Sequence, residues 1–172
     1  MVNHSATRLP SALLIEMDVA LINSPLGTIH LEASAIGITK LIFTEEQPEK
    51  ASDNAHILKC IDQLAAYFEG SRKSFNIPLD MDGTDFQKKV WHQLQNIPFG
   101  KTISYLDLAK QLGNPKSIRA AAHANGQNTV SIIVPCHRVI GSDGSLTGYA
   151  GGLWRKQWLL EHEMQGKQQR LF

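Results

Sequence analysis

The amino-acid sequence predicts a chain of two unlike parts, an α/β half over residues 1–83 and a mostly helical half over residues 84–172. Two observations predict this division. Strand-like runs precede one amphipathic helix in the first part, and short helices with clear capping residues fill the start of the second. A length of 172 residues suits one domain or two small ones. We therefore place the domain boundary between residues 83 and 84.

Three runs with β-branched residues or alternating polarity predict strands in the first half. They are Leu13–Leu21, Thr28–Leu31 and Ile36–Phe43. Ala55–Phe68 predicts a helix that ends before Gly70. Its apolar stripe is formed by Ile57, Leu58, Ile61, Leu64, Ala65 and Phe68. Ser71–Gly83, with Pro78 and an Asp-Met-Asp-Gly run, predicts a linker.

The second half opens with three predicted helices. Thr84 and Gln87 form a capping box for a helix over Phe86–Ile97. Ser104 caps a short helix that ends at Leu112 before Gly113. Asn114-Pro115 opens the next helix, which runs to about Ala124. Two short helices across a tight turn outline a helix-turn-helix, and an ordinary helical hairpin is the alternative that the pattern leaves open.

Charge is distributed unevenly between the two halves. Residues 1–83 hold 6 Lys/Arg and 11 Asp/Glu, whereas residues 84–172 hold 11 and 5, so the nets are −5 and +6. A basic half suits a polyanionic partner, although solvated surface charge is the alternative. The last helix of the helix-turn-helix is rich in alanine, and Arg119 is the long cation in its middle. Such a helix either packs closely on another helix or lies in a DNA groove.

The candidate nucleophile follows an apolar run. Thr129–Val134 predicts a buried strand and leads into Pro135-Cys136-His137-Arg138-Val139, after which glycines are frequent. A cysteine acts as a nucleophile only as its thiolate, so we expect cationic neighbours to lower its pKa. Adjacent side chains in an extended chain point apart, so we expect a water between His137 and the sulfur, and Glu163 to orient His137. A small buried structural cysteine is the other interpretation.

Cysteine usage and the N-terminus bear on cofactors and location. The chain has two cysteines and no Cys-x-x-Cys pair, so we expect no zinc, no other metal and no cofactor. Free thiols suit a reducing compartment. The N-terminus has the pattern of neither a secretory signal nor a membrane span. We therefore expect a cytoplasmic protein without membrane attachment.

The motif around Cys136 resembles the signature of the O6-alkylguanine-DNA alkyltransferases, also called methylated-DNA–protein-cysteine methyltransferases. The likeness covers Thr84–Glu163. It includes Ile103-Ser104-Tyr105, Gly113-Asn114-Pro115-Lys116, Arg119-Ala120, Asn128, Gly148-Tyr149 and Trp158-Leu159-Leu160-Glu161-His162-Glu163. The resemblance implies a winged-helix C-terminal domain. The first half resembles the family in outline only, as a ribonuclease-H-like α/β domain.

The resemblance also implies roles for individual residues. Cys136 resembles the alkyl acceptor, His137 and Glu163 its activating relay, Asn128 the brace of the turn, and Tyr105 the proton donor to the leaving guanine. Tyr149, Ala150 and Val139 would line the base pocket, and Ala150 stands where several relatives have Ser. Arg119 would fill the stack after a nucleotide is turned out, with Ile118, Ala120 and Asn125 beside it in the minor groove. Lys101, Lys110 and Lys116 would contact phosphates.

The expected function is DNA repair in a single turnover by a monomer that binds double-stranded DNA. The alkyl group would pass from a flipped O6-alkylguanine to Cys136, and the thioether would remain there. Whether O4-alkylthymine is also repaired stays open. A cysteine hydrolase and a winged-helix DNA binder without chemistry are the alternative functions.

Overall fold

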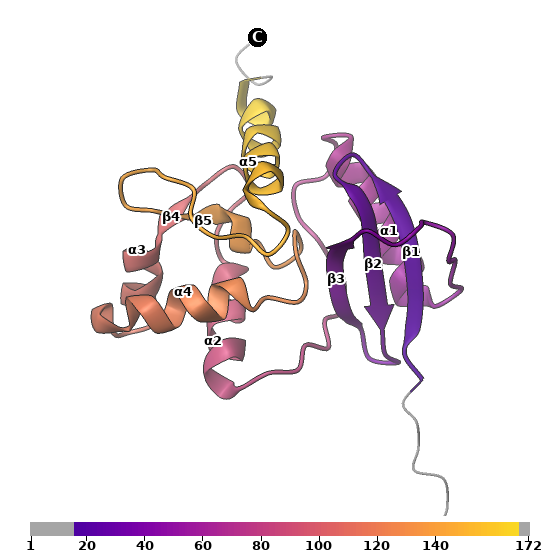
Figure 1. Cartoon of the computed structure of the whole chain (residues 1–172), viewed down its shortest axis with the longest axis horizontal. Helices are drawn as coiled ribbons and strands as arrows, with labels where there is room; N and C mark the ends of the chain where they lie inside the picture. Colours follow the sequence, from indigo (N-terminus) through magenta and orange to yellow (C-terminus); the bar gives the residue numbers. More distant parts are fainter. Residues whose placement is uncertain (1–15, 169–172) are drawn as a thin grey trace, which may run out of the picture.

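A computed structural model describes residues 16–168, with side chains described up to residue 165. The N-terminal half is an antiparallel sheet with the order β1-β2-β3, formed by β1 (Asp18–Ser24), β2 (Gly27–Ala33) and β3 (Ile38–Thr44). Helix α1 (Ala55–Phe68) packs against this sheet, and β3 is the strand that faces the helical half (Figure 1). Part of the predicted strand Leu13–Leu21 lies outside the described residues, and its described end belongs to β1.

The bounds of α1 match the prediction, but its buried face is rotated from the predicted stripe. Leu58 is 48% exposed, although it was predicted to face the core. The buried residues of α1 are Ile57, Cys60, Gln63, Leu64 and Tyr67. A stripe of apolar residues predicts a helix well but places its face only approximately, because a polar residue such as Tyr67 can take a core position when it finds a partner.

The C-terminal half is mostly helical. Its elements are α2 (Asp85–Leu94), β4 (Ile103–Ser104), α3 (Tyr105–Gln111), the 3₁₀ turn η1 (Pro115–Ser117), α4 (Ile118–Gly126), the 3₁₀ turn η2 (Cys136–Arg138), β5 (Val139–Ile140) and α5 (Leu153–Gln168). Strands β4 and β5 pair in parallel. The predicted capping box of Thr84 and Gln87 is present, and Ser104 forms a second one with Asp107.

The prediction that Thr129–Val134 forms a strand is wrong. The segment is buried as expected, but it forms a turn in which the Val134 amide donates to the Val130 carbonyl at 3.1 Å. Ile132 has a φ of 70°, which is unusual for a β-branched residue. Only Val130 bridges to a strand, Leu41 of β3. An apolar β-branched run predicts burial, and it cannot distinguish a strand from a buried turn.

The two halves share one hydrophobic core. Buried residues of the sheet and α1 are continuous with those of α2, α4 and the turn before Cys136. The outer edge of β3 is occupied at two points, by Leu79 against Ile38 and by Val130 against Leu41. The boundary between residues 83 and 84 therefore stays a prediction, because packing is continuous across it.

The contact of the linker with β3 can be tested at Gly37. A methyl group there would collide with the carbonyl of Pro78, which accepts a hydrogen bond from the Ile38 amide at 2.9 Å. Gly37→Ala should destabilise the fold by about 1–3 kcal/mol. Thermal unfolding should show a lower Tm, by about 2–4 °C for each kcal/mol. Gly126→Ala is the control, because its methyl group would meet nothing within 4 Å. Equal Tm values for both variants would contradict this docking of the linker.

Candidate active site

The Asn128 side chain holds the turn that leads to Cys136. Its Oδ1 accepts from the Val130 amide at 3.0 Å, and its Nδ2 donates to the carbonyls of Val130 at 3.3 Å and Val134 at 2.8 Å. The Cys136 amide in turn donates to the Val134 carbonyl at 2.8 Å. The side-chain amide thus substitutes for a strand partner. This geometry matches the bracing position expected for Asn128.

Asn125 does not lie where the sequence led us to expect it. We predicted it to contact DNA, but it is only 4% exposed. Its Nδ2 donates to the Cys136 carbonyl at 3.4 Å. Asn125 lies on the buried face of α4 together with Ala121 and Ala124. Its position is therefore that of a second brace for η2, away from the exposed surface of α4.

A buried carboxylate joins the segments around the cysteine. Glu163 is fully buried, and five donors reach it. They are His137 Nε2 at 2.8 Å, Arg138 Nε and Nη2 at 2.9 Å each, the Tyr67 hydroxyl at 2.8 Å and the Gly100 amide at 3.3 Å. Arg138 Nη1 also donates to the Ile97 carbonyl. The His137–Glu163 contact that we expected is present, and its catalytic role stays a prediction.

The protonation states of this pair follow from its surroundings. Burial alone would raise the pKa of the Glu163 carboxyl, but His137 and Arg138 outweigh burial and hold that pKa well below its usual range. The carboxylate is therefore ionised and accepts the Nε2 proton of His137. Burial lowers the pKa of His137 against the opposing effect of Glu163, so the imidazole is neutral near pH 7. Nδ1 is then an unprotonated acceptor, and it is buried without a hydrogen-bond partner among the described residues.

The expected lowering of the Cys136 thiol pKa is wrong for the resting protein. Cys136 is only 6% exposed, and burial raises the pKa of its thiol. The Asn128 side chain and the positive charge of Lys156 act in the opposite direction without cancelling burial. The extended geometry assumed around the thiol is also wrong, because Cys136–Arg138 forms a 3₁₀ turn. A thiol in this setting needs a proton acceptor, and neutral His137 has the right protonation state for that task.

Lys156 is a buried cation that the sequence interpretation missed. Its Nζ donates to the Val139 carbonyl at 2.7 Å, to the carbonyls of Thr147 and Gly148 at 3.3 Å each, and to the Tyr105 hydroxyl at 3.4 Å. The Tyr105 hydroxyl donates to the Thr147 carbonyl at 2.7 Å. Burial lowers the pKa of Lys156 to about 8. Lys156 and Tyr105 together connect the start of α3, β5 and the loop before α5.

The predicted base-pocket residues lie on or next to this loop. Tyr149 is partly buried and Ala150 is exposed, whereas Val139 is fully buried and presents its backbone carbonyl to Lys156. Arg155 fixes the end of the loop, because its Nη1 donates to the Gly151 carbonyl and its Nε to the Leu26 carbonyl, each at 2.8 Å. The hairpin between β1 and β2 is thereby tied to the loop that carries Tyr149.

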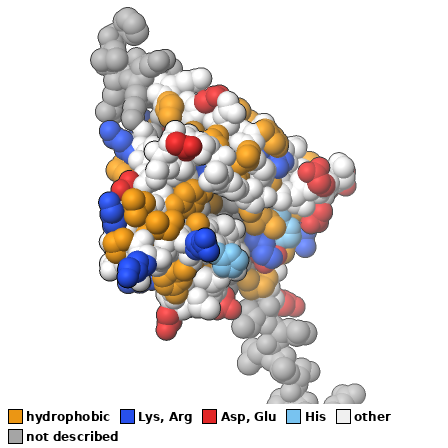
Figure 2. Space-filling model, turned by 60° about the vertical axis from the view of Figure 1, so that its left-hand side comes forward, with side chains coloured by type: hydrophobic (Ala, Val, Ile, Leu, Met, Phe, Trp, Pro, Cys, Tyr) orange, Lys and Arg blue, Asp and Glu red, His pale blue; other side chains and the backbone are white. Residues whose placement is uncertain are grey.

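The other predicted DNA-binding residues are exposed on the helical half. Ile118, Arg119 and Ala120 lie on the outer face of α4, opposite the buried Ala121 and Ala124. The three lysines Lys101, Lys110 and Lys116 are also exposed. Figure 2 shows several Lys and Arg side chains around apolar patches on the helical side of the molecule. Among residues 16–168, none covers the outer face of α4, which is therefore accessible to a partner.

One of the missed residues, Lys156, carries a sequence signal. Lys156, Leu159, Leu160 and Glu163 follow the i, i+3, i+4, i+7 spacing of one helix face, and all four are buried. A cation and a carboxylate on an apolar stripe indicate buried charges that need partners. Tyr67 and the bidentate role of Arg138 have no such signal, because Tyr67 lies 96 residues from Glu163 in the sequence.

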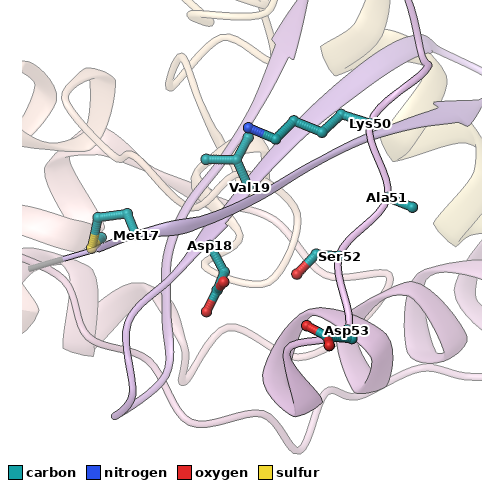
Figure 3. A pocket seen from close by; sticks show the side chains of 7 residues that line it. All are labelled: Met17, Asp18, Val19, Lys50, Ala51, Ser52 and Asp53. Atoms are coloured by element: carbon teal, nitrogen blue, oxygen red, sulfur yellow. The ribbon is translucent and has the colours of Figure 1, made fainter.

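A hollow on the N-terminal half lies apart from this site (Figure 3). Its lining residues are Met17, Asp18, Val19, Lys50, Ala51, Ser52 and Asp53. They lie at the start of β1 and before α1, and β1 is the sheet edge farthest from Cys136. Within residues 16–168, no group of three or more His, Cys, Asp or Glu side chains could hold a metal ion, and no helix is long and apolar enough to cross a membrane.

A mostly helical domain that buries a cysteine next in sequence to a histidine bonded to a buried carboxylate defines a class of proteins with a candidate thiol nucleophile. Family models narrow the class. The DNA-binding domain of 6-O-methylguanine DNA methyltransferase matches residues 85–165, and the ribonuclease-like domain of that family matches residues 17–81. The chain therefore belongs to the methylated-DNA–protein-cysteine methyltransferase family.

Individual relatives agree with this assignment. The methylated-DNA–protein-cysteine methyltransferase of Mycobacterium tuberculosis is 46% identical over 147 residues, which cover 83% of this chain and 89% of the relative. That of Methanosarcina acetivorans is 44% identical over 153 residues, covering 86% and 98%. The crystal structure of Mycobacterium tuberculosis OGT in complex with DNA superposes with a TM-score of 0.79 at 44% identity, over 86% of this chain and 93% of that one. The predicted fold class is thus confirmed.

The charge of Lys156 should set the reactivity of the Cys136 thiol. In the resting protein, alkylation of Cys136 by iodoacetamide should have its midpoint above the pKa of about 8.5 of an exposed cysteine. Near pH 7, below the pKa of about 8 of Lys156, Lys156→Met should slow alkylation of Cys136, because it removes the cation that favours the thiolate. Peptide mass spectrometry separates Cys136 from Cys60, and Lys88→Met, at an exposed position, is the control. An unchanged or faster alkylation rate near pH 7 in Lys156→Met would contradict this assignment.

Proposed function

We propose that this protein repairs DNA by direct reversal of damage, taking the alkyl group of O6-alkylguanine onto Cys136. The thiol proton passes to His137, and the sulfur attacks the alkyl carbon. A carbon–sulfur bond forms as the bond from that carbon to guanine O6 breaks, and the electron pair stays on the base. Tyr105 supplies a proton to the departing guanine, with Lys156 in hydrogen-bonding distance of its hydroxyl. The thioether stays on the protein, so each molecule acts once.

The observation that carries this proposal is the arrangement around Glu163. An ionised, fully buried carboxylate fixes the Nε2 proton of a neutral imidazole in the residue that follows Cys136. The opposite ring nitrogen is free to accept a proton. The family relationship and the DNA complex of the Mycobacterium tuberculosis relative support DNA as the substrate.

We propose further that α4 enters the minor groove and that the damaged nucleotide is flipped out. The outer face of α4 carries small side chains beside Arg119, which suits close approach to a narrow groove. A base inside a duplex conceals its O6 substituent, so a buried thiol requires the nucleotide to leave the stack. Lys101, Lys110 and Lys116 would contact phosphates. The protein would act as a monomer, and repair of O4-alkylthymine belongs to the same proposal.

The cytoplasm is the proposed site of action. Both cysteines are free, and a suicide thiol works only while it stays reduced. The reaction as written needs no metal and no cofactor.

Stoichiometric transfer is the direct test of this function. With excess duplex that contains O6-methylguanine, the protein should gain one methyl group, on the peptide that contains Cys136. Cys136→Ala should lose transfer and keep DNA binding, because its sulfur is buried whereas the expected DNA contacts of α4 are exposed. The intact mass gives the number of methyl groups, and the peptide mass gives their position. A gel-shift measurement gives DNA binding by Cys136→Ala. Several turnovers for each molecule would indicate a cysteine hydrolase, and DNA binding without any transfer would indicate a non-catalytic binder.

Arg119 should matter for duplex DNA and not for the free base. Its side chain is exposed, so Arg119→Ala should change the free energy of unfolding by no more than about 0.5 kcal/mol. If Arg119 fills the gap left by the flipped nucleotide, its loss exposes an unstacking cost of about a few kcal/mol, and duplex repair should slow by at least about tenfold. Reaction with free O6-benzylguanine should be nearly unchanged.

A control at another surface cation distinguishes the proposed role of Arg119 from the general effect of removing one positive charge. Lys88→Ala removes an exposed cation from α2 and should leave the ratio of duplex rate to free-base rate as in the wild type. Equal losses on duplex and free base in Arg119→Ala would place Arg119 in the chemistry or the fold.

A further inference from the structure

Tyr67 connects the N-terminal half directly to the candidate relay. It is the penultimate residue of α1, it is fully buried, and its hydroxyl donates to Glu163 Oε1 at 2.8 Å. The same oxygen accepts from His137 Nε2 at 2.8 Å and from Arg138 Nη2 at 2.9 Å. One carboxylate oxygen therefore receives donors from both halves of the chain.

Packing fixes the direction of the Tyr67 hydroxyl. Four rings surround the phenol with centroids 5.2–6.2 Å away, namely Phe68, Phe75, Phe99 and His162. Hydrogen bonding between His162 Nε2 and the Tyr67 carbonyl, at 2.7 Å, fixes the backbone of the same residue against α5. The hydroxyl is thus held in place from several elements.

A buried tyrosine needs an acceptor for its hydroxyl, and this need alone could explain the hydrogen bond from Tyr67 to Glu163. Phenylalanine would fill the same space without that need. The identity of the acceptor suggests a further role, because the Glu163 carboxylate also accepts from His137. A carboxylate offers about four lone-pair positions, and five donors lie within 3.3 Å of Glu163. Each donor takes up part of the negative charge, so each one weakens the carboxylate as an acceptor for the others.

We propose that Tyr67 is a positioning residue for alkyl transfer, which holds the Glu163 carboxylate against His137 and limits the negative charge that the imidazole meets. The inference rests on the proposed function, because it matters for repair only if His137 accepts the thiol proton. A weaker negative charge next to His137 favours its neutral form. The phenol thereby keeps the imidazole ready to accept a proton at lower pH.

Other titratable side chains surround Tyr67, Glu163 and His137, and the test leaves them unchanged. Arg138 belongs to η2 together with Cys136, Lys156 and His162 come from α5, and Tyr149 comes from the loop before α5. Arg138 and Lys156 both lower the pKa of His137. A change at Tyr67 leaves all of them in place, so a shift in the titration of His137 can be assigned to the phenol.

Tyr67→Phe is the first variant, and the readout is the pH dependence of the reaction with free O6-benzylguanine, which avoids effects on DNA binding. The acid limb of the rate profile should move to higher pH by about 0.5–1 unit, because the imidazolium meets a more negative carboxylate. Tyr67→3-fluorotyrosine keeps the ring and makes the phenol a stronger donor, so its acid limb should move to lower pH. The opposite directions of the two shifts distinguish tuning from damage to the fold.

Phe75→Leu is the matched control, since Phe75 contacts the Tyr67 ring and makes no hydrogen bond to Glu163. It should lower the Tm and leave the acid limb in place. An NMR titration of His137 gives a second readout that needs no substrate. If the wild type reacts with neither O6-benzylguanine nor methylated duplex, the proposed function fails, and the NMR shifts still test Tyr67. The inference would be overturned if both Tyr67 variants showed the same pH profile and the same His137 titration as the wild type. If Tyr67→Phe does not fold, the fluorotyrosine variant alone provides the test.

Discussion

The buried ion pair between Glu163 and Arg138 is the interaction on which the rest of the site depends. A carboxylate removed from water is stable only when its charge is neutralised and its lone pairs are occupied, and here a bidentate guanidinium does both. Loss of one partner of such a pair costs about 3–5 kcal/mol, because the other charge stays buried alone. The pair also fixes α5 against η2. The positions of His137 and Cys136 follow from that contact.

The ion pair explains how the site can be buried and still prepared for chemistry. Burial raises the pKa of the thiol and lowers the pKa of the imidazole, so both groups are neutral in the resting protein. The anionic carboxylate contacts His137, whereas the cationic Lys156 contacts the Tyr105 hydroxyl and lowers the pKa of the Cys136 thiol. In the proposed reaction, Glu163 would stabilise an imidazolium as it forms, and Lys156 would stabilise a thiolate or a phenolate. Charge is thus arranged for the transition state more than for the resting thiol.

Local signals in the sequence predicted the helices well and the turn before Cys136 poorly. The capping boxes at Thr84 and Ser104 act within four residues of the chain, so the helix starts could be found from spacing alone. The shape of Thr129–Val134 depends on the Asn128 side chain and on its bridge to the outer edge of β3, and neither is visible in an apolar run. Cys136, His137 and Glu163 could be named because their motif is specific to the family. Tyr67 and Arg138 acquire their roles from partners distant in sequence, so no local pattern could assign those roles.

The occupied edge of β3 affects how freely the two halves could be exchanged or engineered. An isolated second half would leave Val130 without its strand partner and Glu163 without the phenol. An isolated first half would expose the edge of β3 at Leu41, where intermolecular pairing could occur. A chimera with the sheet domain of another protein would need a matching edge strand, a tyrosine at the end of the helix and a hairpin carbonyl for Arg155. Selection on either half therefore constrains the other, and the two should have evolved as one module.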